Sequence, residues 1–171
     1  VVGTVFTWIF QDQLGLINYL LTSVGAKAIQ WNNDPKFAML MLVTATMWQK
    51  AGYNMVIYLA GLQSIPTELM EAATIDGAST FQKFRYITLP LLKNTHMFVM
   101  ITCMINAFRS FDLVYTMTQG GPLNATKTIV MYVYEQAFNK NYYGRAAAGG
   151  IVLFVFMAAL TIIRFKIEKE D

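Results

Sequence analysis

The side chains that could carry out covalent chemistry in this chain are few. One histidine, His96, and one cysteine, Cys103, cannot build a His-based triad, an internal disulfide or a multi-ligand metal site. Glu68 and Glu71 form an acidic pair three residues apart, but no His or Cys lies near them in the sequence. No phosphate-binding loop of the form GxxxxGKS or GxxxxGKT is present. We therefore predict no catalytic residue, no metal and no cofactor.

Other polar side chains interrupt long apolar stretches, where ionisable groups are costly and usually face a cavity or a partner. Asn54 follows Lys50 by four residues, so both lie on one face of an expected helix. Asn106 and Arg109 recur at helical spacing in a second stretch, and Asp112 is close enough to Arg109 to neutralise part of its charge. We predict that Asn54, Asn106 and Arg109 border a path through the apolar layer. Hydrogen bonds between helices, or snorkelling of Lys and Arg toward an interface, remain the alternative.

The composition indicates a membrane protein. Hydrophobic residues make up 56% of the 171 residues, charged residues only 13%, and the mean hydropathy is +0.42. Soluble domains are about 45–50% apolar and about 25% charged. A soluble fold of this size could not bury so much apolar surface, whereas a bilayer would solvate it. The net charge of +3 comes without a basic stripe on a polar face, so we predict no nucleic-acid partner.

Three apolar segments are long enough to cross the hydrocarbon layer as helices, since about 20 residues suffice. They are residues 37–62, 94–117 and 145–165. The apolar run 1–10 is too short to cross and lacks the basic start of a signal peptide, so we interpret it as the end of a truncated helix. The expected fold is an all-α, polytopic helical membrane protein with three full spans plus the end of a truncated one.

The polar segment between the first two spans, residues 63–93, predicts two short helices, at 66–75 and 79–86. Gly77 separates them, because glycine adopts the backbone angles of a sharp turn without strain. Ser79 and Gln82 have the spacing of a capping box. Pro90 is expected to close the segment. Two further short helices are expected, at residues 14–24 and 126–138.

The spacing of residues in this polar segment is specific. Glu71, Ala72 and Ala73 are followed after three intervening residues by Gly77. Nine more residues separate Gly77 from Ile87, and one separates Ile87 from Leu89 and Pro90. This resembles the EAA signature of binding-protein-dependent ABC importer permeases at every defining position. Further segments resemble the carbohydrate-uptake branch, and in particular its maltose- or glycerol-3-phosphate-type first permease. They are residues 31–35, 59–66, 75–79, 111–115 and 118–122.

The resemblance implies that residues 1–171 are a C-terminal part of an ABC transporter transmembrane domain and that residues 63–93 are its cytoplasmic coupling loop. Glu71, Ala72, Ala73, Asp76 and Gly77 would form the surface that docks on the ATPase. Ile87, Leu89 and Pro90 would anchor the loop on the membrane-embedded helices.

The family further implies a multi-pass protein of the bacterial inner membrane that imports a sugar or glycerol phosphate. Its partners would be a pair of cytoplasmic ATP-binding subunits, a second permease subunit, the lipid bilayer, and an external solute-binding protein docked around residues 120–141. A permease for amino acids, peptides or phosphate stays open as an alternative. A membrane enzyme lacks the residues discussed above, and a channel would not need an ATPase-docking loop.

Basic residues orient the chain only weakly. The expected cytoplasmic side carries Lys83, Arg85, Lys93, Arg164, Lys166 and Lys169, and the opposite side carries Lys27, Lys36, Lys127, Lys140 and Arg145.

Overall fold

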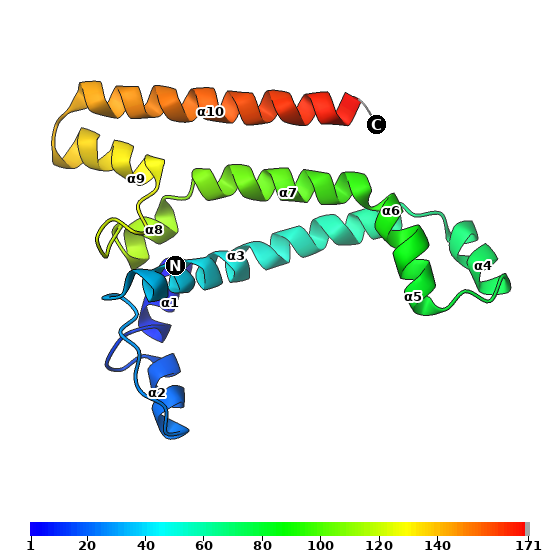
Figure 1. Ribbon diagram of the computed structural model, residues 1–171, viewed down its shortest axis with the longest axis horizontal. Coiled ribbons are helices and arrows are strands. Elements are labelled where there is room, and N and C mark those ends of the chain that lie inside the picture. The colour runs from blue at the N-terminus through cyan, green and yellow to red at the C-terminus, as the bar shows by residue number, and fades with distance from the viewer. Residues whose placement is uncertain (170–171) are drawn as a thin grey trace.

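The computed structural model describes the backbone of residues 1–169 and the side chains of residues 1–162, and this part of the chain is helical, without strands. Three long helices run alongside one another, with α7 (Lys93–Phe108) between α3 (Pro35–Gln63) and α10 (Tyr143–Lys169) (Figure 1). The side chains of Arg164, Lys166 and Lys169 lie outside the described residues. The shorter elements are α1 (Val2–Ile9), α2 (Leu16–Ser23), α4 (Thr67–Ile75), α5 (Thr80–Lys83), η1 (Phe84–Thr88), α6 (Leu89–Leu91), α8 (Asp112–Met117), α9 (Ile129–Tyr134) and η2 (Glu135–Asn139).

The short elements gather at the two ends of the long helices. At one end, α4, α5, η1 and α6 form a hairpin, residues 67–91, that projects beyond α3 and α7 (Figure 1). At the other end, α1 and α8 pack against α3 and against each other, α2 packs against α1, and α9 packs against α10. We call these the hairpin end and the core end. The expected short helix at 14–24 is confirmed as α2, and the one at 126–138 as α9 and the π-helical turn η2.

Helix α3 begins at a capping residue and a proline, and it ends shortly before a second proline. Pro35 occupies its first position, and the Asp34 carboxylate caps it by accepting a hydrogen bond of 2.8 Å from the Lys36 N–H. It ends at Gln63, ahead of Pro66. The helix expected at 37–62 is therefore confirmed, with a slightly earlier start.

Helix α10 confirms the helix expected at 145–165. Its segment Tyr143–Ile162 is the one stretch of the described chain that is both long and apolar enough to cross a membrane. Helix α3 has the length, but polar residues such as Gln49, Lys50 and Asn54 lower its apolar character.

The prediction of a single helix at residues 94–117 is wrong. Helix α7 ends at Phe108, and a separate helix, α8, begins at Asp112. The Ser110 carbonyl between them accepts a hydrogen bond of 2.8 Å from the Thr128 hydroxyl. The break lets the apolar face of α8 turn toward α1 and α3, so tertiary burial overrides local helix propensity.

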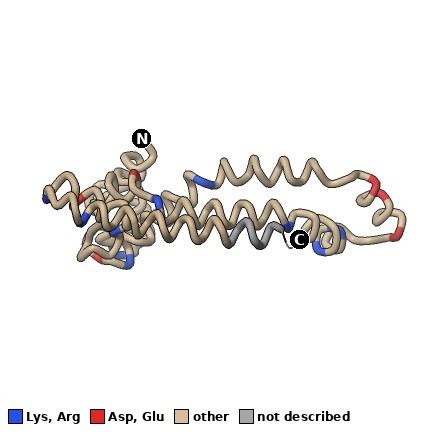
Figure 2. Tube along the Cα trace, turned by 90° about the horizontal axis from the view of Figure 1, so that it is seen from above, with Lys and Arg blue, Asp and Glu red and all other residues tan. Residues whose placement is uncertain are grey.

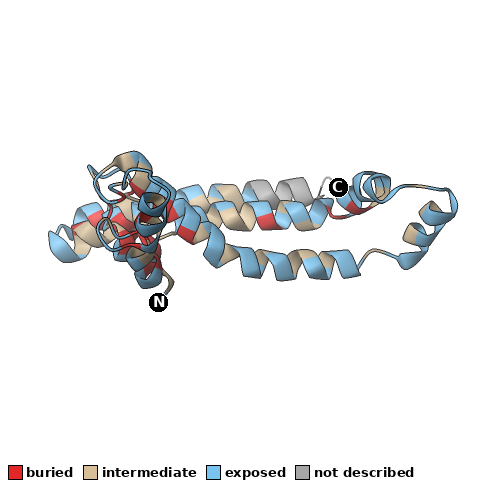
Figure 3. Ribbon diagram, turned by 90° about the horizontal axis from the view of Figure 1, so that it is seen from below, coloured by how far each residue is buried: buried red, intermediate tan, exposed pale blue. Residues whose placement is uncertain are grey.

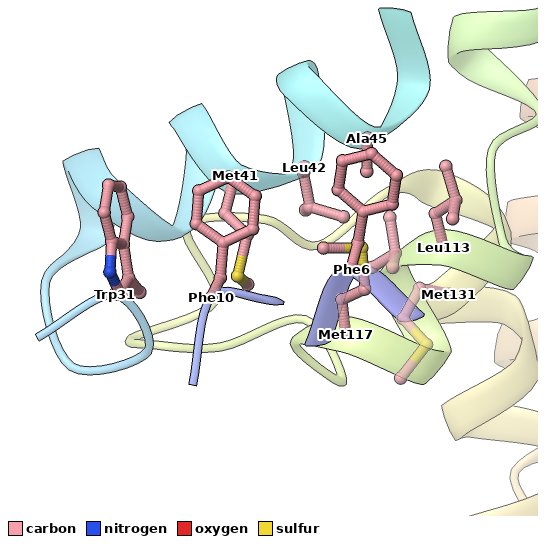
Figure 4. Close-up of a cluster of buried hydrophobic side chains, with 10 residues drawn as sticks. Phe6, Phe10, Trp31, Met41, Leu42, Ala45, Leu113, Met117 and Met131 are labelled. Atoms are coloured by element: carbon pink, nitrogen blue, oxygen red, sulfur yellow. The ribbon is translucent and has the colours of Figure 1, made fainter. Parts of the chain in front are cut away.

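Most of the buried apolar side chains lie at the core end, whereas the long helices and the hairpin are largely exposed (Figure 3). Side chains from α1, α3 and α8 meet there, with Met41 fully enclosed (Figure 4). The Phe10 and Trp31 rings meet edge to face at 4.8 Å between centroids. The cluster consists of Phe6, Phe10, Trp31, Met41, Leu42, Ala45, Leu113, Val114, Met117 and Met131.

The segment between α1 and α3 is held by one buried amide, Asn18, which is 3% exposed. Its Nδ2 donates to the carbonyls of Asp12 and Ile29, at 2.8 Å each. Its Oδ1 accepts from the Ile29 N–H at 3.0 Å and from the Trp31 indole at 3.1 Å. All four hydrogen-bonding positions of the amide are therefore used.

Candidate functional site

The hairpin bends at a turn that is formed by a glycine and two backbone hydrogen bonds. Gly77 has φ +74°, the left-handed conformation that favours glycine. The Ala78 N–H donates to the Ala73 carbonyl at 2.9 Å, and the Gly77 N–H donates to the Thr74 carbonyl at 3.1 Å. These two bonds form a Schellman motif, which satisfies the last carbonyls of α4 and ends the helix.

The second limb of the hairpin starts with the expected capping box, which is confirmed. The Ser79 N–H donates to Gln82 Oε1 at 2.7 Å, and the Gln82 N–H donates to Ser79 Oγ at 3.3 Å. Lys83 Nζ reaches back and donates to Thr74 Oγ1 of α4 at 2.7 Å. The angle between the two limbs is therefore fixed by local hydrogen bonds rather than by an apolar core.

The residues of the EAA-like signature lie on the outer surface of this hairpin. Helix α4 has no buried residue: Glu71 and Ala72 are exposed, and Ala73 is half-buried. Asp76 and Gly77, which follow the helix, are exposed as well. The Glu71 carboxylate forms no ion pair within the described chain. The side chain of Ile75 is 87% exposed at the tip. The surface combines an unpaired charge, small side chains and an apolar tip, which suits the docking of another protein.

Pro90 lies close to the end of the segment, since α6 ends at Leu91 and α7 begins at Lys93. The chain stays helical through α5, η1 and α6, because the π-helical turn at Phe84–Thr88 widens the helix ahead of the proline. Proline has no N–H for the i−4 carbonyl and its ring would collide with that group in a regular α-helix. Here the Leu89 N–H donates to the Phe84 carbonyl, one residue farther back than in an α-helix.

The buried side chains nearest the expected anchors are Thr88, between Ile87 and Leu89, and Leu92 just after the hairpin. Leu89 and Pro90 are exposed, and Ile87 is half-buried. Leu92 is buried, with its Cδ2 3.0 Å from where a Cβ on Gly61 of α3 would stand. The glycine therefore allows α3 to approach the start of α7 closely.

The three residues predicted to border a path are placed along α3 and α7. Asn54 donates from Nδ2 to the Cys103 sulfur at 3.3 Å, so the hydrogen bond between helices named as the alternative is present. Asn106 is half-buried, one turn along α7 from Cys103, and Arg109 is exposed at the end of α7. No ion pair joins Arg109 to Asp112 in the described chain, because the helix breaks between them.

A hollow at the core end lies next to this helix break. Its polar lining consists of Gln49 from α3 with Asp112 and Thr116 from α8, and its apolar lining includes Phe111 and Tyr115. Gln49 was not predicted as a site residue. Its signal was a polar amide inside an apolar helix, which by itself does not distinguish a lining residue from an interhelical contact.

Tyr58 and His96 form a second polar contact between α3 and α7, with Tyr58 Oη 2.6 Å from His96 Nδ1. Together with Asn54–Cys103 it gives the two helices a seam of polar pairs. No three His, Cys, Asp or Glu side chains come together in the described part of the chain, which therefore offers no metal centre there.

The loop that leads into α10 is braced by ion pairs. Glu135 pairs with Lys127, and its Oε1 lies 2.7 Å from Lys140 Nζ. The hydrogen bonds from Lys127 and Lys140 lower the pKa of Glu135 from 4.5 to about 2. Beside this triad, the Arg145 guanidinium stacks over the Tyr142 ring at 5.0 Å.

The sequence matches a family of known transport components over nearly its whole length. Residues 1–170 match the family described as binding-protein-dependent transport system inner membrane component. The trehalose/maltose transport system permease protein MalF of Thermococcus litoralis is 38% identical over 95% of this chain and 56% of its own length. The sn-glycerol-3-phosphate transport system permease protein UgpA of Agrobacterium fabrum is 37% identical over 99% of this chain and 58% of its own length. The chain thus spans little more than half of these relatives.

Solved structures agree with the fold. A crystal structure of a bacterial ABC transporter involved in the import of alginate superposes with a TM-score of 0.89 at 22% identity, covering 99% of this chain and 59% of the other. A second, of the alginate transporter in complex with its alginate pentasaccharide-bound periplasmic protein, gives 0.86 at 22% identity, over 95% of this chain and 57% of the other. The hairpin with its EAA-like signature, the matched family and these relatives lead to one conclusion: the chain belongs to the family of inner membrane components of binding-protein-dependent transport systems.

Proposed function

We propose that the chain is part of the transmembrane permease subunit of an ATP-driven importer. The observation that carries this proposal is the hairpin of residues 67–91, which projects beyond α3 and α7 with Glu71 and its small neighbours exposed. A permease without its own nucleotide-binding loop needs such a protrusion to receive force from a separate ATPase. The hydrogen-bonded turn at Gly77 would keep the hairpin rigid while it does so.

In this proposal the hairpin end is cytoplasmic. Ala72 and Ala73 allow a close approach to a groove of the ATP-binding subunit, and the Glu71 carboxylate is available for a basic residue there. Ile87, Leu89 and Pro90 belong to the limb that returns to the long helices. Movement of the ATPase pair would displace the hairpin, and α3 and α7 would carry that displacement to the core end.

The solute would pass beside the polar residues of α3 and α7. Asn54, Asn106 and Arg109 are the proposed lining, and Gln49 and Asp112 extend it into the hollow at the core end. The amides and the guanidinium can donate hydrogen bonds to hydroxyl or phosphate oxygens. The names of the relatives, which include maltose and glycerol-3-phosphate permeases, support a sugar or a glycerol phosphate as the solute.

The membrane would be crossed by α3, by α7 continued by α8, and by α10, with α1 as the end of a further helix. A second permease subunit would complete the path, and a pair of ATP-binding subunits would engage the hairpins. A periplasmic solute-binding protein would dock at the core end. The crystal structure of the alginate transporter in complex with a periplasmic protein supports a partner of this kind.

The test is capture of the cognate ATP-binding subunit by the full-length permease, purified with its partner permease in detergent. Glu71→Lys reverses the exposed charge and should lower the captured amount at least tenfold, which corresponds to about 1.4 kcal/mol. Lys27→Glu is the matched control, because it reverses an exposed charge outside the hairpin and should leave capture unchanged. Equal capture by wild type and Glu71→Lys would remove the docking role of Glu71, and no capture by wild type would remove the importer proposal.

A further inference from the structure

The two limbs of the hairpin carry opposite charge. Helix α4 and the turn hold Glu68, Glu71 and Asp76 and no basic residue, whereas the returning limb holds Lys83 and Arg85 and no acidic residue. Figure 2 shows the acidic residues on the far limb and the basic ones on the limb that returns to the long helices. After Asp76 the next acidic residue in the sequence is Asp112. We call residues 80–91 the basic limb.

The basic limb also exposes aromatic rings. Phe81 is 73% exposed, Phe84 51% and Tyr86 75%. Phe81, Phe84 and Arg85 follow the i, i+3, i+4 spacing of one helix face. Arg85 forms no ion pair in the described chain, so its guanidinium is available to an outside anion.

The direction of the basic limb sets it apart from the long helices. In Figure 1, α5 runs across the direction of α3 and α7, between their ends and the more distant α4. A helix that lies across the ends of membrane-spanning helices lies in the plane of the membrane surface. Aromatic rings and Lys or Arg are the side chains that concentrate at this depth.

We propose that the basic limb lies in the headgroup layer of the inner leaflet and binds anionic phospholipid there. The Arg85 fork can hold two oxygens of one lipid phosphate, Lys83 adds a second positive charge at the rim, and Phe81 and Phe84 enter the interface on the same face as Arg85. The charge pattern separates this occupant from the ATPase: the acidic limb faces a protein partner with basic residues, and the basic limb faces an anionic surface. The inference rests on the proposed function, because the inner leaflet follows from placing the hairpin in the cytoplasm.

The test uses the complete importer with full-length permease, reconstituted in nanodiscs of phosphatidylcholine with increasing phosphatidylglycerol. Phe84→Trp provides a fluorescent reporter on the lipid-facing side of the limb, measured as the difference from the same complex without the substitution. Brominated phosphatidylglycerol should quench this signal at lower mole fraction than brominated phosphatidylcholine does. Adding Arg85→Gln should raise the phosphatidylglycerol fraction needed for half-quenching roughly fivefold, the effect expected for one basic residue at a charged surface.

Two matched variants sharpen the comparison. Arg85→Lys keeps the charge and should recover most of the preference for the anionic lipid. Lys27→Gln removes one positive charge outside the hairpin and should leave the quenching curve unchanged. ATPase capture in detergent should be the same for wild type and Arg85→Gln.

Equal quenching by the two brominated lipids would overturn the lipid inference while leaving the importer proposal intact. Loss of ATPase capture by Arg85→Gln in detergent would also overturn it, since the limb would then be covered by the ATPase. Failure of the unmodified permease to capture the ATPase would instead count against the proposed function.

Discussion

At the scale of single residues, Asn18 is the polar side chain on which the core end depends most. Its amide satisfies four partners drawn from Asp12, Ile29 and Trp31. Asn18→Ala leaves those buried groups without partners, so we expect a loss of about 1–3 kcal/mol in the free energy of unfolding in detergent. Thermal unfolding followed by tryptophan fluorescence measures this, since Trp31 is one of the partners.

Asn32→Ala is the matched control for this prediction, because Asn32 lies next to Trp31 but is exposed. It should change the unfolding midpoint little. An equal effect of the two substitutions would mean that the amide network of Asn18 does not hold the segment between α1 and α3.

Glu135 makes the stability of the loop before α10 depend on pH in a defined window. Its pKa in the folded chain is lowered to about 2, against 4.5 in the unfolded chain. A lowered pKa means that the contribution is fully present above pH 4.5 and is lost as the pH falls toward 2. The difference in unfolding midpoint between wild type and Glu135→Gln should therefore be constant near neutral pH and shrink between pH 4.5 and 2.

Glu68→Gln serves as the comparison for the pH prediction, since it removes an exposed carboxylate that has no ion pair in the described chain. Its midpoint should follow wild type across the same range. A Glu135→Gln difference that is already lost at pH 6 would contradict the lowered pKa.

At this scale the sequence indicates candidate residues but not the residues they contact. Asn54 stood out because an amide inside an apolar helix is rare, yet its contact with Cys103 joins residues 49 positions apart and is invisible in the chain order. Asn18 did not stand out at all, because it lies in a mixed segment where polar residues are common. A side chain's burial is decided by elements that the sequence does not place in space.

At the scale of elements, a glycine in the hairpin turn and a glycine within α3 form a matched pair for substitution. Gly77 has φ +74° with open space around it, and Gly52 lies within α3, also with open space. Gly77→Ala should cost about 1–2 kcal/mol through backbone strain alone. Gly52→Ala should stabilise α3 by roughly 0.5–1 kcal/mol, because alanine loses less backbone freedom than glycine in a helix.

ATPase capture separates the two glycine positions further. Gly77→Ala should weaken capture, since it loosens the turn that holds the proposed docking surface, and Gly52→Ala should not. Unchanged capture by Gly77→Ala would show that the left-handed turn is not needed for docking.

The elements that local signals define were predictable from the sequence, and those that tertiary packing defines were not. The capping box at Ser79 and the turn at Gly77 act within a few residues, so their spacing reveals them. The break after Phe108 carries no such signal. It exists because Leu113, Val114 and Met117 are buried against α1 and α3. The widened turn that carries the helix through Pro90 is likewise a response of the backbone that the residue types do not specify.

At the scale of the whole molecule, α3 and α7 are the link between the hairpin end and the core end. Three residues on one face of α3 contact α7 or the residue before it. Gly61 lies against Leu92 and Thr95, Tyr58 against His96, and Asn54 against Cys103. A seam of this kind resists sliding, because each contact is specific to one register. We expect the two helices to move as one rigid body during transport.

Asn54→Cys tests the rigid-body expectation, because it places a thiol opposite the native Cys103, whose sulfur lies 3.3 Å from Asn54 Nδ2. A disulfide also requires Cα atoms about 4.4–6.8 Å apart, so titration of free thiols after oxidation first establishes that the bond has formed. The oxidised full-length importer should transport within about twofold, or about 0.4 kcal/mol, of the same variant kept reduced. Asn54→Cys with Cys103→Ala cannot form the bond and controls for the oxidant. If oxidation stops transport and a thiol reductant restores it, α3 and α7 must separate or slide in each cycle, and the force from the hairpin must reach the core end through one of them alone.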